Sequence, residues 1–345
     1  MNVTLKSLCK RFSSGDRLDS SQVKEVGKYP VFGGNGIRGY ADIYNFNGRC
    51  AIIGRQGANC GNVRYYNGKA FMTEHAIVVE TNEYNDIGYL AYRMSLMDLG
   101  RYQGQSAQPG LSVKTISGLP IEVPELNVQR KIWKVLNNLD QKVDNNTQIN
   151  NNLEELAYTI FLHDFANKTK NGTIGDIIKE NEKSKIKVGD AKDIKGEYPF
   201  FTSGESILEW NDYLADGRNL FLNTGGNADV KFYVGKATYS TDTWCITSKN
   251  EMSDYLYLYL KTIKDELDRK IFHGSGLKHL QKPLFKQEKI YIPKHEELKK
   301  FNIQVKTMFD TISANKRENQ RLNSLKEYLL PLLMNGQINV DDIEI

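Results

Sequence analysis

Two stretches of the chain carry a long, regular pattern of apolar residues with steps of four and three. In the first stretch the pattern occupies Ile132, Leu136, Leu139, Val143, Asn146, Asn150, Leu153, Ala157 and Ile160. In the second it occupies Phe301, Val305, Met308, Ile312, Asn315, Asn319, Leu322, Lys326 and Leu329. A sustained repeat of about 3.5 residues without internal Gly or Pro is typical of helices that pack as coiled coils. The pattern predicts a helix over 126–165, about 60 Å long, and a second helix over 295–336.

Asparagines occupy the middle of both patterns, where an apolar residue is expected. Asn146 is the midpoint of the first pattern, and Asn315 is the midpoint of the second. If the two helices pack antiparallel, their midpoints meet, so we expect Asn146 and Asn315 to face each other. A polar residue in an apolar seam fixes the register of a coiled coil at some cost in stability. Two ordinary amphipathic core helices are the alternative to a coiled coil.

The two helical patterns belong to a repeat that spans nearly the whole chain. Tyr29-Pro30-Val31-Phe32 recurs as Tyr198-Pro199-Phe200-Phe201, an offset of 169 (198 − 29). The same offset carries Gly48-Arg49 onto Gly217-Arg218, and Gly57 onto Gly226. A repeat of this length with few gaps predicts a duplicated unit with pseudo-two-fold symmetry.

The segment before each helix has a β-type pattern. Short β-rich runs occur at 50–53, 76–79, 220–222 and 244–246, and turns rich in Gly and Asn lie at 33–36 and 224–227. One helical segment interrupts each copy, near 86–100 and 254–271. We therefore predict an α+β fold. It has two pseudo-symmetric strand-rich domains (1–125, the first module, and 167–294, the second module), separated by two long helices in regions 126–166 and 295–336 that pack as an antiparallel coiled coil. Residues 337–345 form a tail.

Composition narrows the class of protein without choosing a function. The 345 residues carry 46 Lys and Arg against 42 Asp and Glu, a net charge of +4, which permits nucleic-acid binding without requiring it. No apolar stretch approaches 20 residues and the N-terminus lacks a secretory signal, so we expect a cytoplasmic protein with no membrane partner. The four Cys and five His show no paired spacing, so no disulfide framework or metal site is predicted.

One glycine motif raises the question of a cofactor. Gly34-Asn35-Gly36-Ile37-Arg38-Gly39 fits G-x-G-x-x-G, but a dinucleotide site needs a helix after the glycines, and residues 40–45 are poor helix formers. An adenine methyltransferase would carry an Asn-Pro-Pro-Tyr-like segment, and the chain has no Pro-Pro. We therefore predict a glycine turn and no cofactor. The histidines are scattered, and no catalytic residue is predicted.

Basic and amide side chains gather in the glycine-rich turns, where nucleic-acid contacts are the favoured interpretation. Lys and Arg neutralise phosphates, and Arg, Gln and Asn hydrogen-bond to base edges. The candidates of the first module are Arg38, Arg55, Gln56, Asn59, Asn62, Arg64, Gln105, Ser106 and Gln108. Those of the second are Asn223, Thr224, Asn227, Lys231, His273, Ser275, Lys278 and His279. Arg55-Gln56-Gly57 becomes Thr224-Gly225-Gly226 in the second copy, as expected if the two modules read different bases.

The chain resembles the specificity subunit of type I restriction–modification systems over essentially its whole length. Residues 29–37 are similar to the start of many target-recognition domains, and residues 121–140 are similar to the start of the helical region that follows them. In the second copy Leu298 replaces Gln129, and the segment 293–296 is a looser version of the same motif. The resemblance implies a subunit without catalysis of its own. It would bind double-stranded DNA at a bipartite, asymmetric site and recruit two methyltransferase subunits, and through them the restriction (motor-nuclease) subunits.

Two other functions are compatible with the same patterns. A scaffold could hold two lectin-like or peptide-binding modules apart with its coiled coil, and salt-sensitive binding to duplex DNA distinguishes it from a specificity subunit. A self-sufficient methyltransferase is the other alternative, and methyl transfer by the isolated chain would favour it.

Overall fold

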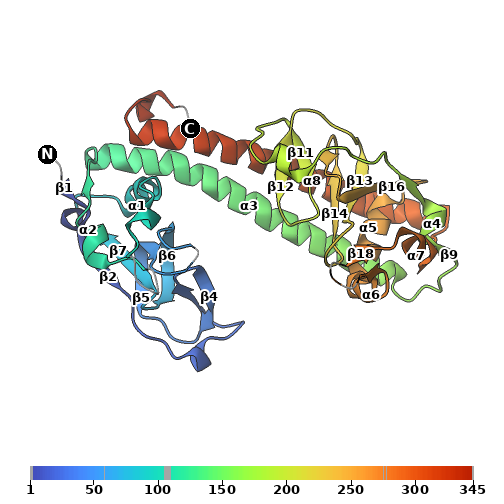
Figure 1. Cartoon of the computed structure of the whole chain (residues 1–345), viewed down its shortest axis with the longest axis horizontal. Coiled ribbons are helices and arrows are strands. Elements are labelled where there is room, and N and C mark those ends of the chain that lie inside the picture. Colours follow the sequence, from blue (N-terminus) through green and yellow to red (C-terminus); the bar gives the residue numbers. More distant parts are fainter. Residues whose placement is uncertain (1–2, 58, 105–109, 275, 277, 344–345) are drawn as a thin grey trace. The chain divides into compact units, whose positions relative to one another are not determined.

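The computed structural model describes residues 3–57, 59–104, 110–274, 276 and 278–343. It divides into two compact units, Met1–Gln141 with Leu322–Ile345 (the first unit) and Lys142–Arg321 (the second unit). Two long helices, α3 (Leu126–Phe165) and α8 (His295–Met334), contribute to both units (Figure 1). The helix predicted over 126–165 is therefore confirmed, and α8 ends two residues before the predicted end.

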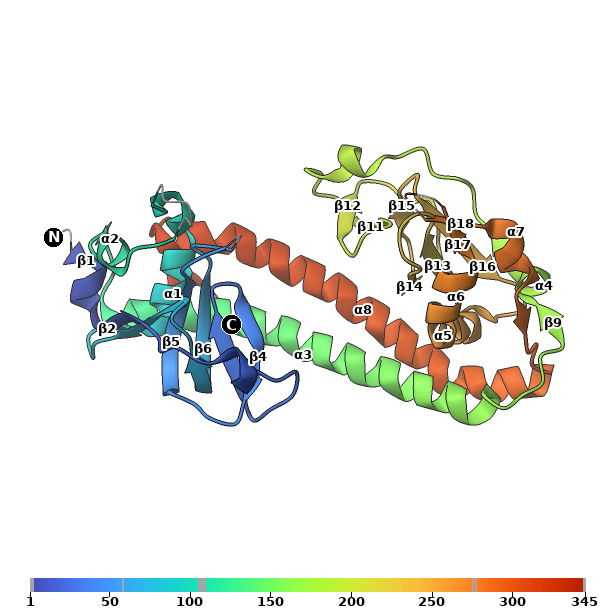
Figure 2. The ribbon, with the colours of Figure 1, turned by 60° about the horizontal axis from the view of Figure 1, so that its bottom comes forward.

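In the first unit, six strands form a sheet in the order β2-β7-β5-β6-β3-β4, of which Figure 2 labels β2, β4, β5 and β6. They are β2 (Cys9–Ser14), β3 (Tyr29–Gly33), β4 (Gly36–Ala41), β5 (Phe46–Gly54), β6 (Val63–Met72) and β7 (Ala76–Thr81). All neighbours are antiparallel except β3 and β6. A short pair joins β1 (Val3–Thr4) to β8 (Pro120–Ile121). The helices of the module are α1 (Ile87–Ser95) and α2 (Val113–Ser117), with 3-10 turns at Leu5–Leu8, Ser20–Gln22 and Leu99–Tyr102; a further 3-10 turn, Val340–Asp342, follows α8.

The second unit repeats this topology in shorter strands. Its sheets have the orders β10-β16-β13-β14 and β12-β11-β15, and two-stranded pairs join β9 to β19 and β17 to β18. The strands are β9 (Gly172–Thr173), β10 (Ile178–Glu180), β11 (Tyr198–Phe201), β12 (Ile207–Trp210), β13 (Arg218–Asn223), β14 (Val230–Val234), β15 (Thr238–Tyr239), β16 (Thr243–Ser248), β17 (Phe272–His273), β18 (His279–Leu280) and β19 (Lys289–Ile290). The helices are α4 (Ile174–Ile177), α5 (Ser253–Thr262), α6 (Lys264–Lys270) and α7 (Lys282–Gln287), with a 3-10 turn at Val188–Ala191.

The duplication predicted from the sequence is confirmed at the level of strand pairing. The order β2-β7-β5-β6 corresponds to β10-β16-β13-β14, and the parallel pair β3–β6 corresponds to the parallel pair β11–β15. One difference is that β6 is continuous, whereas its counterpart is divided into β14 and β15 at Gly235, whose φ is +124°. The predicted α+β fold and the strand-rich character of both modules are thus confirmed.

The Gly-Arg pair of the repeat, Gly48-Arg49 and Gly217-Arg218, has the same structural role in both units. Gly48 and Gly217 have φ angles of +136° and +85°, which favour glycine, and each is followed by an arginine that bonds to a carboxylate at the start of the next helix of its module. Arg49 Nη2 lies 3.1 Å from Asp86 Oδ2, and the guanidinium lies 4.7 Å from the ring of Trp133 on α3.

In the second unit, Arg218 makes the equivalent contacts. It bonds to both carboxylate oxygens of Asp254, at 2.7 and 3.0 Å, and reaches Asp310 on α8 at 2.5 Å. Asp254 is buried, so the arginine compensates a charge that would otherwise be costly inside the protein. Each arginine therefore fixes its module to one of the long helices.

The long helices run antiparallel, and their asparagines pair differently from the expectation. Asn146 Nδ2 donates to Asn319 Oδ1 at 2.9 Å and to Glu318 Oε2 at 2.7 Å, and Asn315 Nδ2 donates to Asn150 Oδ1 at 2.9 Å. The expected direct contact of Asn146 with Asn315 is wrong by one helical turn. The contacts are symmetric about positions 148 and 317, between the two asparagines of each helix, so each asparagine meets the other member of the opposite pair.

Candidate nucleic-acid interface

In the first unit, the β3–β4 turn packs against the loop between β5 and β6. A Cβ atom on Gly54 would lie 2.2 Å from the Gly34 carbonyl oxygen, and a Cβ on Gly34 would lie 2.6 Å from the Gln56 carbonyl oxygen. Because these distances are shorter than any real Cβ contact, only glycine permits the approach. The glycines of the sequence motif therefore bring two loops together. They form the predicted turn, and the strand β4 follows it where a dinucleotide-binding motif has a helix.

Polar and basic side chains meet on this joined surface. The Asn59 amide donates to Asn35 Oδ1 across the two loops. Arg38 extends from β4 over Gly33, and the guanidinium of Arg64 on β6 lies beside Gly36. Asn35, Arg38 and Arg64 are exposed, as is Asn62. Asn35 was not among the predicted DNA contacts, although its position in the Gly33-Gly34-Asn35-Gly36 turn indicated an exposed polar side chain.

Arg55 and Gln56 tie this loop to the segment after residue 109. Arg55 Nε donates to the Leu111 carbonyl at 3.2 Å, and the Leu111 amide donates to the Arg55 carbonyl at 2.8 Å. Its Nη1 lies 3.4 Å from Ser14 Oγ and from the Glu74 carbonyl. The half-buried guanidinium is thus engaged by the protein, and we propose a positioning role for Arg55. Gln56 forms a β-bridge with Gly110 through its backbone.

The same bridge recurs in the second unit, between Gly225 and His279. Both partners are displaced by 169 from Gln56 and Gly110, so the backbone frame is retained while the side chains differ. His273 and His279 face each other in the β17–β18 pair, and both are exposed. Asn227 is also exposed, and Lys278 bonds to Asp268 at 2.7 Å.

Two residues predicted as contacts in the second module are instead used inside the loop. Asn223 is only 5% exposed, and its amide donates to the carbonyls of Gly225 and Asn227 while its oxygen accepts from the Asp229 amide. It is buried because the carbonyls of the tight loop need a donor. The Lys231 side chain is 15% exposed and lies 3.3 Å from Asp229 Oδ2. Both side chains therefore have partners inside the loop, and their contact with DNA stays a prediction.

The remaining candidates vary in position. Thr224 Oγ1 donates to the Asp242 carbonyl at 2.9 Å, so its hydroxyl supports the same loop. Gln105, Ser106, Gln108 and Ser275 lie outside the described residues. An open hollow of about 1090 Å³ in the second unit is bordered by Ser203–Glu205, Gly225–Asn227 and Arg269, among others. Gly225, one of the residues that border it, is the repeat counterpart of Gln56, so this edge of the module corresponds to the first surface.

Two classes of site are not formed by the described residues. In the described ranges no three His, Cys, Asp or Glu side chains lie together as metal ligands would. None of the helices in the described part of the chain combines the length and apolar character needed to cross a membrane.

Comparison with known proteins agrees with the fold and the duplication. Residues 1–155 and 167–327 match the family described as type I restriction modification DNA specificity domain. The chain is 40% identical over 121 residues to the EcoprrI specificity subunit of Escherichia coli, which covers 35% of this chain and 30% of that protein. It is 24% identical over 302 residues to the MjaIX specificity subunit of Methanocaldococcus jannaschii, covering 74% and 70%.

A solved structure supports the same fold over a longer span. The crystal structure of the type I restriction–modification S subunit from M. genitalium matches with a TM-score of 0.72 at 16% identity, over 96% of this chain and 95% of that one. The chain spans less than a third of the E. coli relative that it matches. With both halves matched by the family, the chain belongs to the type I restriction modification DNA specificity family, and the resemblance seen in the sequence is confirmed.

Proposed function

We propose that the chain is a sequence-specific DNA-binding subunit of a cytoplasmic type I restriction–modification complex. Each module reads one half of a bipartite, asymmetric site in double-stranded DNA, and the long helices set the distance between the halves. Two methyltransferase subunits bind the chain, and the restriction subunits join through them. Methyl transfer and cleavage belong to these partners, so the chain itself has no catalytic residues.

The observation that carries this proposal is the retained frame with exchanged side chains. The bridge Gln56–Gly110 recurs as Gly225–His279, and Gly57 and Gly226 have φ angles of +83° and +81°. A scaffold that keeps its turns while changing Gln to Gly and Gly to His is suited to reading different bases. The proposed contacts are Arg38, Gln56, Asn59, Asn62 and Arg64 in the first module, and Asn227, His273, Lys278 and His279 in the second.

A module exchange tests the proposal. Residues 1–125 are replaced by the corresponding module of a relative that methylates a different motif, and the methylated sequence is read with the methyltransferase subunit present. We expect one half of the motif to change and the other half to stay. A change in both halves, or in neither, contradicts the assignment of one half-site to each module.

A further inference from the structure

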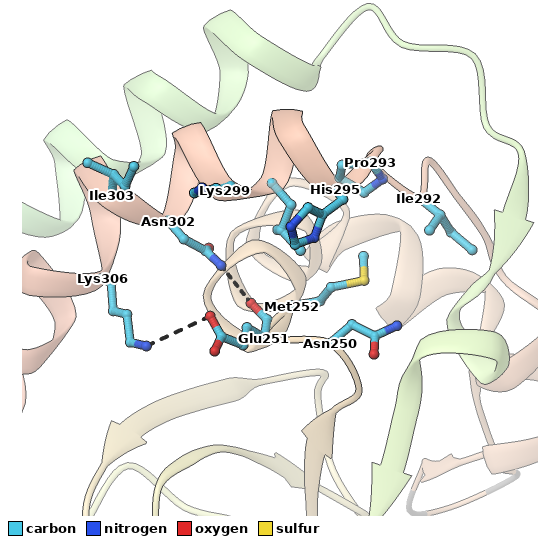
Figure 3. Close-up of a pocket in the computed structure, with 11 residues that line it drawn as sticks. Asn250, Glu251, Met252, Ile292, Pro293, His295, Lys299, Asn302, Ile303 and Lys306 are labelled. Atoms are coloured by element: carbon cyan, nitrogen blue, oxygen red, sulfur yellow. Dashed lines mark hydrogen bonds and ion pairs between the residues drawn. The ribbon is translucent and has the colours of Figure 1, made fainter.

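A hollow in the second unit lies where the module meets the start of α8. Figure 3 shows the residues that line it, and its volume is about 550 Å³. One wall is α8, with His295, Lys299 and Ile303, and the other is the β16–α5 turn, with Asn250 and Met252. The floor is apolar, because Met252 and Leu298 are buried. Ile303 is 71% exposed on the rim, so an apolar side chain borders the hollow next to its apolar floor.

One polar group in the hollow lacks a partner. Asn302 is 9% exposed, and its Nδ2 donates to the Glu251 carbonyl at 3.0 Å. This bond fixes the orientation of the amide, and within the described chain no donor reaches its buried Oδ1. A buried acceptor without a donor destabilises the folded protein, because it has lost its hydrogen bonds to water. The turn that holds Glu251 is also strained, because Asn250 and Glu251 have φ angles of +53° and +56°.

The corresponding place in the first unit is filled by the chain itself. The repeat offset relates Asn302 to Trp133 and Leu298 to Gln129. The Trp133 ring packs directly on α1, where a Cβ on Gly88 would lie 2.0 Å from its Nε1. Gln129 accepts from the Asp86 amide at 2.9 Å and donates to the Pro124 carbonyl at 2.8 Å. In the first copy the Trp133 indole and the Gln129 amide therefore fill this place, whereas the second copy has the smaller Asn302 and the apolar Leu298 there.

The charged side chains around the hollow indicate which charge a binding partner carries. His295, Lys299 and Lys306 line it, and Glu251 is the one carboxylate among the residues that do. Glu251 pairs with Lys306 at 3.9 Å, which leaves Lys299 as the lysine of the hollow without a carboxylate among the residues that line it. We propose that the hollow is a docking site for an acidic segment of a partner protein. An apolar side chain of that segment covers Met252, Leu298 and Ile303, and a donor satisfies Asn302 Oδ1.

This inference rests on the proposed function, under which the partner is one of the two methyltransferase subunits. Because the first copy is closed at the corresponding place, the two methyltransferase subunits dock on non-equivalent surfaces. The expectation is specific to this end of the chain: changes in the hollow affect one of the two partners and leave the other in place.

The test is binding of the cognate methyltransferase subunit to the full chain, measured by native mass spectrometry and titration calorimetry. Asn302→Trp fills the hollow with the residue of the first copy, and Lys299→Glu reverses one charge of its rim. Lys300→Glu is the matched control, because it makes the same charge change at the next, exposed position outside the hollow. Specific duplex DNA is titrated in parallel, and thermal unfolding verifies each variant.

We expect wild type and Lys300→Glu to bind two partner subunits. Lys299→Glu and Asn302→Trp should weaken one of the two by about tenfold or more, with DNA affinity unchanged. Lys299 is exposed, so its variant decides the question even if Asn302→Trp unfolds. Wild-type stoichiometry and affinity in Lys299→Glu, or a loss of DNA affinity in its place, overturns the docking site while the proposed function stands. A wild-type chain that binds neither the methyltransferase subunit nor specific DNA overturns both.

Discussion

Replacing the paired asparagines Asn146 and Asn319 by leucine is the most informative change in the helix seam. Asn146 is 2% exposed and donates two hydrogen bonds, to Asn319 and to Glu318. Burying a leucine fully contributes about 1.5–3 kcal/mol, and each lost hydrogen bond costs about 0.5–1.5 kcal/mol. Asn319 is only half-buried, so its leucine gains less. Asn319 also donates two long bonds, to the Val143 carbonyl at 3.4 Å and to Thr147 Oγ1 at 3.3 Å, so the double variant should be more stable than wild type by no more than about 1 kcal/mol.

The single variant Asn146→Leu should gain less, because it leaves the Asn319 amide oxygen and Glu318 without their donor. The difference between the single and double variants measures the coupling between the two asparagines. Urea unfolding, followed by circular dichroism, gives each free energy. The control is Asn151→Leu, which makes the same substitution at an exposed position of α3.

Register is the second measurement on the same variants. A slip of seven residues moves one helix by about 10 Å along the other, which is about three base-pair steps of duplex DNA. In complex with methyltransferase subunits, the double variant should methylate sites of more than one spacer length, whereas wild type and Asn151→Leu methylate one. If the double variant is less stable than wild type and keeps the single wild-type spacer, the asparagines do not fix the register.

Three further predictions concern single residues. Gln56→Ala should lose about 1–3 kcal/mol of discrimination at one base pair, measured by competition between duplexes. Arg55→Ala should instead lower the free energy of unfolding in urea, because Arg55 bonds to the protein. An Arg55→Ala variant of normal stability with altered base preference would contradict the positioning role of Arg55. Arg218→Ala should cost about 3–5 kcal/mol of stability by leaving buried Asp254 uncompensated, as urea unfolding will show; a loss below 1 kcal/mol would mean that water reaches the carboxylate. Hydrogen bonds from Tyr291, the Lys294 amide and Lys168 lower the pKa of Glu297 from 4.5 to about 2. The stabilisation by the ionised Glu297 carboxylate is therefore present above pH 4.5 and lost as the pH falls toward 2, so the melting temperature of wild type should approach that of Glu297→Gln over that window. A constant difference between the two melting temperatures would exclude this linkage.

Features set by local periodicity could be predicted from the sequence. The steps of four and three place α3 from Leu126 to Phe165 because every turn of a helix repeats the same geometry. The strands β5 and β13 follow from apolar runs that are buried on both faces. The duplication is visible because both copies keep glycines at the turns that need a positive φ.

Features set by partners distant in sequence could not be predicted. The midpoints of two patterns do not locate the centre of helix pairing, and so Asn146 meets Asn319 instead of Asn315. Residue type likewise does not show whether a polar side chain is free. Asn223 and Lys231 have the chemistry of DNA contacts, but a loop carbonyl and a neighbouring carboxylate take up their donors.

The central claim, that two diverged modules read one bipartite DNA site, is tested most directly by sequencing methylated adenines in the source genome. The comparison is between cells with this gene and cells in which it has been deleted. We predict one motif that depends on the gene, with two specific, non-palindromic blocks separated by a fixed number of unspecified base pairs. A gene-dependent motif that is continuous or palindromic, or a methylation pattern that the deletion leaves unchanged, would contradict the account.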